Sequence, residues 1–281
     1  MDLVVRAVIV GVVQGLTEFI PVSSSAHLEL TPWLLGWEPD GLLGSLGFDV
    51  FVHLGTLLAL LAYFARDWIG YLGALLASLR ERRIGDDPQR RLAWLLVLAT
   101  VPGAAIGFLL EDLIEQGLHG DSSATRLAIA AFLLVGAAAL WLADRYGGGR
   151  REMPALGARG ALVIGLSQAA ALLPGISRSG ATISAGLALG LTRESAARFS
   201  FLLATPITAG AGLYGSRGLL TEPHSGVEWL AIAGGFAAAA VAGGLAIGFL
   251  LAWLRHRSVA VFSLYRVVLA LVVIGLVLAG R

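Results

Sequence analysis

Four stretches of this chain are long, apolar and nearly free of charged residues, which excludes a fold whose whole surface faces water. They cover residues 92–110, 125–143, 228–253 and 259–280. Each reaches the ~20 residues that a helix needs to cross the hydrocarbon core of a bilayer. Charged residues make up 14% of the chain, against about 25% in a soluble domain. We therefore expect an all-α integral membrane protein with several spans, because helices satisfy their backbone hydrogen bonds within lipid.

The composition also excludes several kinds of chemistry. All 20 basic residues are arginine, and the chain contains neither lysine nor cysteine. Schiff-base chemistry, a phosphate-loop lysine, disulfides and thiolate metal sites are therefore excluded. The formal net charge is +1, which argues against a nucleic-acid partner. Membrane lipids are the expected surroundings.

The charges between the apolar stretches are unevenly distributed. Arginine clusters in 66–91, in 144–159 and in the link 255–257, whereas 111–124 holds four acidic residues and no arginine. Cytoplasmic loops of membrane proteins carry the excess of arginine and lysine. The three basic segments are thus expected on the cytoplasmic side of the cell membrane, and the acidic segment outside. We interpret 80–91 as a solvated loop that contacts anionic headgroups.

With the sides assigned in this way, the sequence predicts six transmembrane helices, at residues 48–65, 92–110, 125–143, 199–216, 228–253 and 259–280. The assigned sides of the loops are consistent with these six crossings only if 1–39 and 160–192 do not cross the membrane. Each of these two segments is long enough for two half-membrane helices, and each has a polar, proline-containing centre. We interpret both as re-entrant helical hairpins, the first entering from outside and the second from the cytoplasm. Polar backbone at that depth is tolerated only where it lines a cavity inside the protein.

The two hairpins resemble each other. An offset of 154 residues places Gly11, Gln14, Val22, Ser23 and Ser25 on Gly165, Gln168, Ile176, Ser177 and Ser179. Three predicted spans separate the hairpins, so the second copy is inverted. The sequence thus predicts one membrane domain, 1–281, built as an inverted repeat of 1–143 and 160–281. Such repeats place polar sites near the midplane, where broken helices meet.

The first hairpin offers a carboxylate beside a break in the chain. Gln14 and Glu18 are four residues apart and therefore share one face of a short helix. Pro21 ends that helix, and the serines that follow can cap the next one. These are Ser23, Ser24 and Ser25. His27 follows Ser24 by three residues, so a hydroxyl and an imidazole can lie on one face.

The second hairpin offers an anion site. Pro174 and Gly175 break the chain, and Ser177 can cap a helix that runs to about residue 191. A helix N-terminus exposes free N–H groups and a positive dipole end, which favour phosphate. Arg178 lies in the first turn and can bind phosphoryl oxygens with two hydrogen bonds. Two such helix N-termini facing each other would form an anion cage.

Charged groups near the bilayer centre cost ~2.5–3.5 kcal/mol each. Burying Glu18, His27 and Arg178 together therefore indicates function. Arg266 lies near the start of the last span, where we expect it to reach the interface or to pair. Asp49, His53 and Glu29 lie near membrane ends and are assigned structural roles.

The residues at both breaks closely resemble the undecaprenyl-diphosphate phosphatase family, which is also known for bacitracin resistance. The matching stretches are QGLTEFIPVSSSAHL at 14–28 and PGISRSGATI at 174–183. The resemblance implies hydrolysis of a C55 polyprenyl diphosphate to the monophosphate and inorganic phosphate, which recycles the lipid carrier for cell-wall glycans. It also implies a divalent cation, Mg or Ca.

The resemblance assigns roles to individual residues. Glu18 and Gln14 match the acidic motif that holds the metal, Ser24 and His27 match the nucleophile and acid/base pair, and Arg178 matches the phosphate-binding arginine. The flanking polar residues, expected to bind substrate, are Ser23, Ser25, Ser177, Ser179 and Thr182. Two positions depart from the family: Gln14 stands where many members have glutamate, and Ala26 where glycine is common.

Several alternatives stay open at this point. Ser24 could attack phosphorus, with His27 or Glu18 taking its proton, or water or a histidine could be the nucleophile. A polyprenyl-phosphate flippase would use the same inverted-repeat site but would need no nucleophile with an adjacent base. A purely structural scaffold would not need the buried charges. We expect the site to open to the outer face, and a homodimer is compatible with the sequence.

Overall fold

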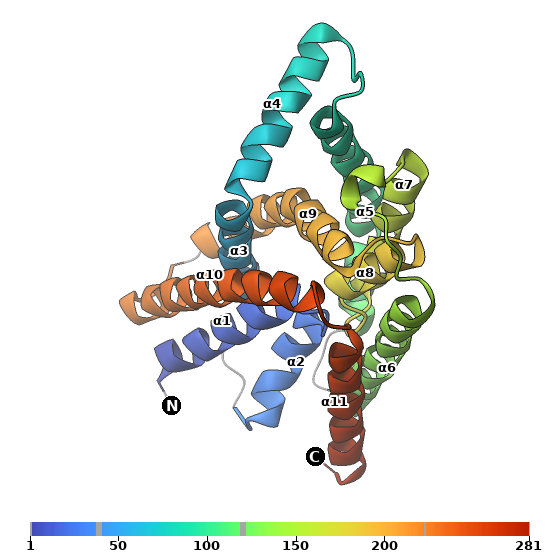
Figure 1. The fold of residues 1–281 in the computed structure, drawn as a ribbon. Coiled ribbons are helices and arrows are strands. Elements are labelled where there is room, and N and C mark those ends of the chain that lie inside the picture. Colours follow the sequence, from blue (N-terminus) through green and yellow to red (C-terminus); the bar gives the residue numbers. More distant parts are fainter. Residues whose placement is uncertain (1, 38–40, 119–121, 222, 281) are drawn as a thin grey trace.

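The computed structural model describes residues 2–37, 41–118, 122–221 and 223–280, and within these ranges every regular element is a helix (Figure 1). The α-helices are α1 Leu3–Phe19, α2 Ser24–Leu34, α3 Leu46–Tyr63, α4 Ala65–Glu81, α5 Pro88–Leu118, α6 Ser123–Tyr146, α7 Ala158–Ser167, α8 Arg178–Ala188, α9 Arg193–Thr221, α10 Gly226–Leu254 and α11 Ala260–Leu278. Two short 3₁₀ helices, η1 Met153–Ala155 and η2 Gln168–Leu172, complete them. The all-α fold expected from composition is confirmed.

Five of these helices are long and apolar enough to cross a membrane, among the residues described: α3, α5 (over Pro88–Leu109), α6, α10 and α11. They coincide with five of the six predicted crossings. The sixth, 199–216, lies within α9, which has 29 residues and is not among these five over the residues that are described. Helix α9 packs against α3, α5, α8 and α10, and it buries Ser200, Thr205 and Thr208 against protein.

The two segments predicted as hairpins are each a helix, a break and a second helix. In the first, α1 ends at Phe19, Pro21 lies in the break, and α2 begins at Ser24. In the second, α7 and η2 precede the break, and α8 begins at Arg178. The serine before each second helix caps it, as the sequence predicts, although α8 ends at Ala188, before the expected residue 191.

The breaks are packed inside the bundle. Helix α1 packs on α10, α2 on α1 and α6, and α8 on α6, α7 and α9. Gly11 and Gly235 allow the backbones of α1 and α10 to touch, because any side chain at Gly11 would overlap the Gly235 carbonyl. This close approach places the break after α1 at a fixed position against α10.

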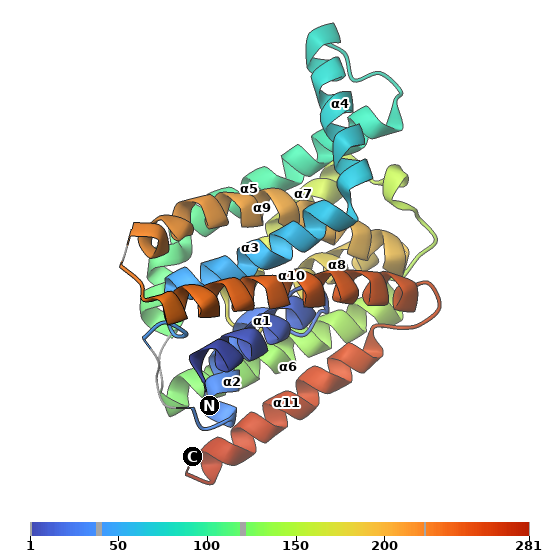
Figure 2. The same cartoon turned by 90° about the vertical axis from the view of Figure 1, so that its left-hand side faces the viewer.

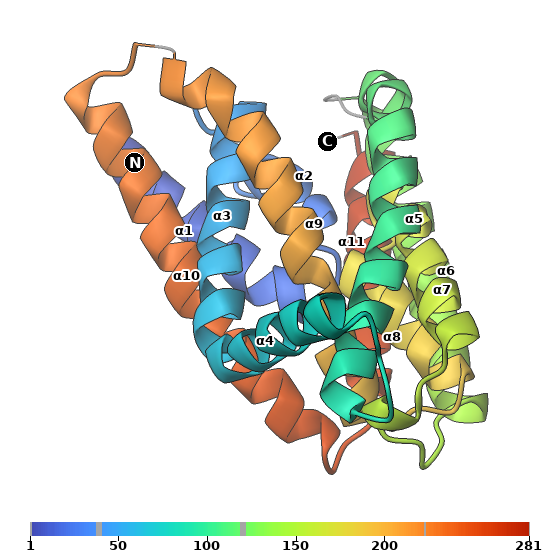
Figure 3. The same cartoon turned by 90° about the horizontal axis from the view of Figure 1, so that it is seen from above.

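The basic segments lie together at one end of the bundle (Figures 2 and 3). The link from α10 to α11, the link from α6 to α7 and helix α4 are at this end, and the chain termini are at the other. The segment 80–91, interpreted as a loop, is a loop only in its middle, because α4 extends to Glu81 and α5 begins at Pro88. The acidic side chains at 111–121 lie outside the part that can be described.

Candidate active site

Glu18 is the centre of the polar cluster at the first break. It lies in the last turn of α1 and is 8% exposed. Its Oε2 accepts hydrogen bonds from Gln14 Nε2, at 3.0 Å, and from Ser24 Oγ, at 2.7 Å. His53 Nε2 of α3 lies 3.6 Å from the same oxygen. The carboxylate therefore connects a hydroxyl, an amide and an imidazole in a site largely closed to solvent.

Arg178 brings the second break to the same carboxylate. Its Nη2 donates to Glu18 Oε1 across 160 residues of sequence, and its Nη1 donates to Thr208 Oγ1 of α9, at 2.9 Å. Arg178 is the first residue of α8, so the guanidinium lies beside the helix N-terminus. The structure thus places together the groups that the sequence assigned to metal binding, attack and phosphate binding: Gln14, Glu18, Ser24 and Arg178.

The serines that precede the two second helices share one unusual geometry. Ser23 and Ser177 have positive φ angles of 78° and 73°. The Ser23 hydroxyl accepts from Ala26 N, at 3.4 Å, and the Ser177 hydroxyl accepts from Gly180 N, at 3.1 Å. These contacts satisfy N–H groups that the first turn of a helix leaves unpaired. Both serines therefore fix the direction of the following helix.

The remaining polar residues expected to bind substrate flank these caps. Ser25 is exposed, and its hydroxyl lies 3.2 Å from that of Ser23. Ser179 and Ser177 make the same contact at 3.2 Å. Thr182 is buried, and its hydroxyl is 2.6 Å from that of Ser200 in α9. Among Ser25, Ser179 and Thr182, Ser25 is the residue that is exposed to solvent.

His27 does not contact Ser24 in the structure. Its Nδ1 is 2.7 Å from the Ser23 carbonyl oxygen, and its Nε2 is 2.7 Å from the Tyr265 hydroxyl. The imidazole also stacks on the Tyr265 ring, with centroids 5.7 Å apart. Both ring nitrogens are thus engaged, and the base that touches Ser24 is Glu18.

Sequence reasoning missed four contributors on distant helices. His53 contacts Glu18, Thr208 contacts Arg178, and Tyr265 contacts His27. Arg266 is fully buried and does not reach the interface. It pairs with the break itself: its Nη2 donates to the carbonyl oxygens of Gly175, at 2.6 Å, and Ile176, at 3.0 Å. A charged residue inside an apolar span was the available signal.

Two features limit what the site can hold. Within the described ranges, no three His, Cys, Asp or Glu side chains are grouped as they would be to hold a metal ion alone. Gln14, which is fully buried, has an Oε1 atom without a hydrogen-bond partner. An oxygen-preferring cation would thus find one carboxylate and one free amide oxygen, and would need further ligands.

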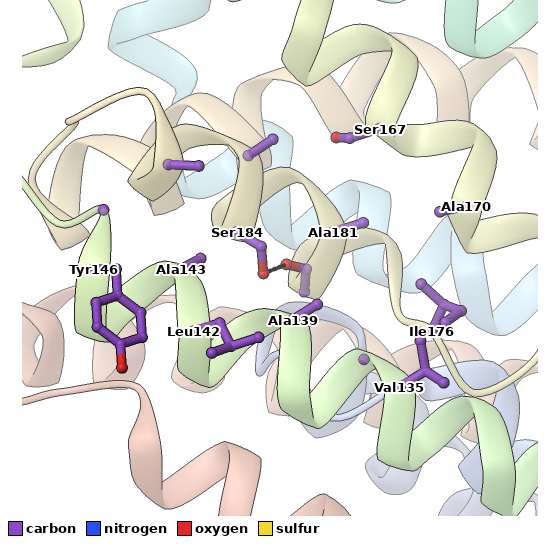
Figure 4. A pocket seen from close by; sticks show the side chains of 15 residues that line it. Val135, Ala139, Leu142, Ala143, Tyr146, Ser167, Ala170, Ile176, Ala181 and Ser184 are labelled. Atoms are coloured by element: carbon purple, nitrogen blue, oxygen red, sulfur yellow. Dashed lines mark hydrogen bonds between the residues drawn. The ribbon is translucent and has the colours of Figure 1, made fainter.

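A separate cavity of about 710 Å³ lies between α6, α7 and α8 (Figure 4). Its lining is mainly small and apolar, and includes Ala139, Ala181 and Ala185. Both serine hydroxyls of the lining are already paired, because Ser184 donates to the Gly180 carbonyl oxygen and Ser167 donates to the Ile164 carbonyl oxygen, each at 2.7 Å. Neither Glu18 nor Arg178 lines this cavity, so it is distinct from the polar cluster.

Known proteins resemble the chain over its full length. Residues 7–272 match a family described as bacitracin resistance protein BacA. An undecaprenyl-diphosphatase of Thermomicrobium roseum is 44% identical over 278 residues, covering 98% of this chain and 99% of that protein. Undecaprenyl-diphosphatases of Desulforudis audaxviator, 46% identical over 97% of both chains, and Pelobacter propionicus, 44% identical over 98% of this chain and 97% of that protein, are similar too. The resemblance drawn from the two motifs is confirmed, and the chain belongs to the bacitracin resistance protein BacA family.

Proposed function

We propose that this protein is an undecaprenyl-diphosphatase of the cell membrane, which hydrolyses the lipid diphosphate to the monophosphate and inorganic phosphate. The observation that carries the proposal is the contact of three groups from two segments: the Ser24 hydroxyl, the Glu18 carboxylate and the Arg178 guanidinium. In this proposal, Ser24 is the nucleophile, Glu18 the proton acceptor and Arg178 the phosphate ligand, and Glu18 contacts both of the others. The names of the full-length relatives support the same substrate.

Binding of the diphosphate would rearrange the ion pair. Phosphoryl oxygens compete with Glu18 for the Arg178 guanidinium, which suits planar, bidentate binding of phosphate. The free N–H groups at the start of α8 lie beside it and favour the same charge. A carboxylate released from its guanidinium is a better proton acceptor. Substrate binding itself would therefore prepare Glu18 to take the proton of Ser24.

The proposed reaction has two steps. The Ser24 oxygen bonds to the terminal phosphorus as the bond to the bridging oxygen breaks, and its proton passes through Glu18 to the departing monophosphate. Water then attacks the phosphoserine, gives one proton through Glu18 to the Ser24 oxygen, and releases inorganic phosphate. Ser24 is preferred to His27 as nucleophile because both His27 nitrogens are engaged. Direct attack by water would leave no phosphoserine, so trapping this intermediate separates the two routes.

A divalent cation, Mg or Ca, would be held by Glu18 and by the free Oε1 of Gln14, together with oxygens of the diphosphate. Magnesium is commonly held by one or two carboxylates plus substrate phosphates, which fits the sparse donor set. When bound, it would neutralise charge on the diphosphate. Gln14 and Glu18 would orient it, and Arg178 would bind the remaining phosphoryl oxygens.

We also propose that both hairpins are re-entrant and that the two halves form an inverted repeat. The matched positions share detailed geometry. Gly165 touches the Ala99 backbone of α5 as Gly11 touches Gly235 of α10. Gln14 and Gln168 are both buried, and each has an unpartnered Oε1. The matched Ser23 and Ser177 caps complete the correspondence.

The site is proposed to open to the outer face of the membrane. The support is the gathering of the basic links at one end of the bundle (Figure 3) and the preference of arginine for the cytoplasmic side. The chain has no cysteine, so a Ser25→Cys variant carries a single thiol. A membrane-impermeant maleimide added outside intact cells should label it. Labelling only after the cells are opened would contradict this orientation.

The function is tested by phosphate release from undecaprenyl diphosphate in detergent, with and without EDTA. Wild type should release phosphate, EDTA should stop the release, and added Mg or Ca should restore it. Arg178→Ala should be inactive at an unchanged elution volume. Arg255→Ala, which breaks the surface ion pair with Glu194, is the matched control and should keep wild-type activity. A folded wild-type protein that releases no phosphate with any metal would refute the proposal.

A further inference from the structure

Helix α4 lies across the basic end of the bundle. In Figures 2 and 3 the spans run from one end of the bundle to the other, whereas α4 runs crosswise to them. It follows directly on α3, whose last residue is Tyr63. Since the spans cross the bilayer, a helix at this angle and at their end lies parallel to the membrane plane. Its position suits the boundary between headgroups and hydrocarbon.

One face of α4 is apolar and uncovered. Ile69, Leu72, Leu76 and Leu79 follow one another at intervals of three, four and three residues, the spacing of a single helix face. Ile69 is 73% exposed and Leu76 is 67% exposed. Apolar side chains this open to solvent are expected where a lipid or protein surface covers them.

The opposite face of α4 fixes the orientation of this stripe. Tyr71 and Ser78 are buried against the bundle, and Trp94 of α5 donates to the Ser78 hydroxyl, at 2.9 Å. Asp67 precedes Tyr71 by four residues and so lies on the same face, where it pairs with Arg198 of α9, at 3.0 Å. Helix α4 is thus held along the face opposite the stripe, and its apolar stripe faces away from the bundle.

Positive charge lies at the C-terminal end of the stripe. Arg80, Arg82 and Arg83 are exposed. The neighbouring Glu81 is bound by Arg90 through two hydrogen bonds, of 2.6 and 2.9 Å, so its charge is already compensated. An apolar stripe with arginines beside it is the pattern of a helix that lies on an anionic bilayer surface.

We propose that α4 is a membrane-surface helix that binds anionic phospholipid headgroups. Ile69, Leu72, Leu76 and Leu79 enter the outer part of the hydrocarbon, and Arg80, Arg82 and Arg83 contact the headgroup phosphates. Charge decides between this occupant and a second copy of the chain. A lipid surface supplies phosphates to these arginines, whereas in a second copy the acidic residues of α4, Glu81 and Asp67, are already paired with Arg90 and Arg198.

Single cysteines test the insertion, because the chain has no cysteine of its own. Leu76→Cys and Ile69→Cys are compared with the adjacent positions Ala77→Cys and Gly70→Cys, which are turned away by about 100°. Each full-length variant carries a nitroxide and is placed in vesicles of phosphatidylcholine and phosphatidylglycerol. Labels at 69 and 76 should collide several-fold more often with oxygen than with a water-soluble nickel chelate, and labels at 70 and 77 should show the reverse.

The charge is tested with Arg80→Gln, Arg82→Gln and Arg83→Gln combined in the Leu76→Cys background. With the arginines present, adding phosphatidylglycerol to phosphatidylcholine vesicles should move the label at 76 deeper, and the triple variant should lose this response. Equal collision with the nickel chelate at 69, 70, 76 and 77 would overturn the proposal. So would labels at 69 and 76 that neither reagent reaches and that couple to a second label, which would assign the stripe to a dimer.

Discussion

Tyr265 and Arg266 are consecutive residues of α11, yet they bind the two different hairpins of the chain. The Tyr265 hydroxyl lies 2.7 Å from Nε2 of His27, in the first turn of α2 after the first break, and Arg266 donates to the Gly175 and Ile176 carbonyls of the second break. A single helix turn therefore holds both segments that meet at Glu18 and Arg178. Small movements of α11 would change the distance between the groups proposed to bind and cleave phosphate.

Replacing Arg266 should reduce the reaction rate more than substrate affinity. Arg266→Gln removes the donors that hold the break before Arg178, and misplacement by about 1 Å can cost roughly 100-fold in rate. We expect kcat to fall by about that factor with a smaller change in KM. Rates of phosphate release over a range of substrate concentrations measure both. A variant with unchanged kcat would show that the break keeps its shape without Arg266.

Gly136→Ala tests the same contact from the opposite helix. A methyl group at Gly136 of α6 would overlap the Arg266 guanidinium, so Gly136→Ala should also slow the reaction. Because the two residues touch, the double variant Gly136→Ala/Arg266→Gln should lose less than the product of the two single losses. Gly244→Ala, where a methyl group meets nothing within 4 Å, should match wild type. Fully multiplicative losses would mean that the two positions act independently.

Glu18→Gln should abolish activity and destabilise the protein. The amide keeps the size of the side chain but cannot take the Ser24 proton, and general acid–base groups contribute about 10²- to 10⁴-fold. It also leaves Arg178 without its anionic partner, and breaking a buried pair costs about 3–5 kcal/mol. The rate of phosphate release and the unfolding temperature in detergent report the two effects. Glu194→Gln, at a surface ion pair, is the control and should change neither.

The sequence predicted the parts of this site that lie within short segments. Pro21, the following serines and the Ser177–Arg178 pair have local signals, and the caps, the breaks and the neighbouring Gln14 and Glu18 were found where expected. The contacts of Thr208 and Arg266 join residues far apart in the chain, so no local pattern encodes them. Spacing placed His27 near Ser24, but the imidazole turns to Tyr265, a residue 238 positions away.

The distinction between local patterns and long-range contacts also explains where the observed helices differ from the predicted ones. Five spans were predicted correctly because lipid-facing helices are apolar throughout. In contrast, α9 faces protein and tolerates polar residues, so hydropathy describes it poorly. The segment 80–91 was interpreted as a loop from its arginines, but its two ends belong to helices, because α4 reaches Glu81 and α5 begins at Pro88.

Ser24 and His27 are distinguished by substitution. Ser24→Ala removes the only hydroxyl that donates to Glu18 within the described contacts, and we expect activity to fall by more than about 1000-fold if it is the nucleophile. His27→Gln should lose far less, because that side chain contacts Ser23 and Tyr265. Incubation with undecaprenyl diphosphate labelled at the terminal phosphate, followed by acid quenching, should leave label on wild type and none on Ser24→Ala. A larger loss of activity for His27→Gln than for Ser24→Ala would indicate that His27, and not Ser24, is the nucleophile.

The capping serines make a prediction about stability alone. Ser23 and Ser177 combine a positive φ with a side-chain cap, so alanine loses the cap and keeps the backbone strain, whereas glycine loses the cap and relieves the strain. Loss of a cap costs about 1 kcal/mol, and glycine replaces capping residues at a cost of only a few tenths. Ser177→Ala should therefore lower the unfolding temperature more than Ser177→Gly does, and the same order should hold at Ser23. Thermal unfolding in one detergent compares the four variants. If alanine and glycine were equally destabilising, the positive φ would contribute no strain, and the hydroxyl alone would account for serine at both breaks.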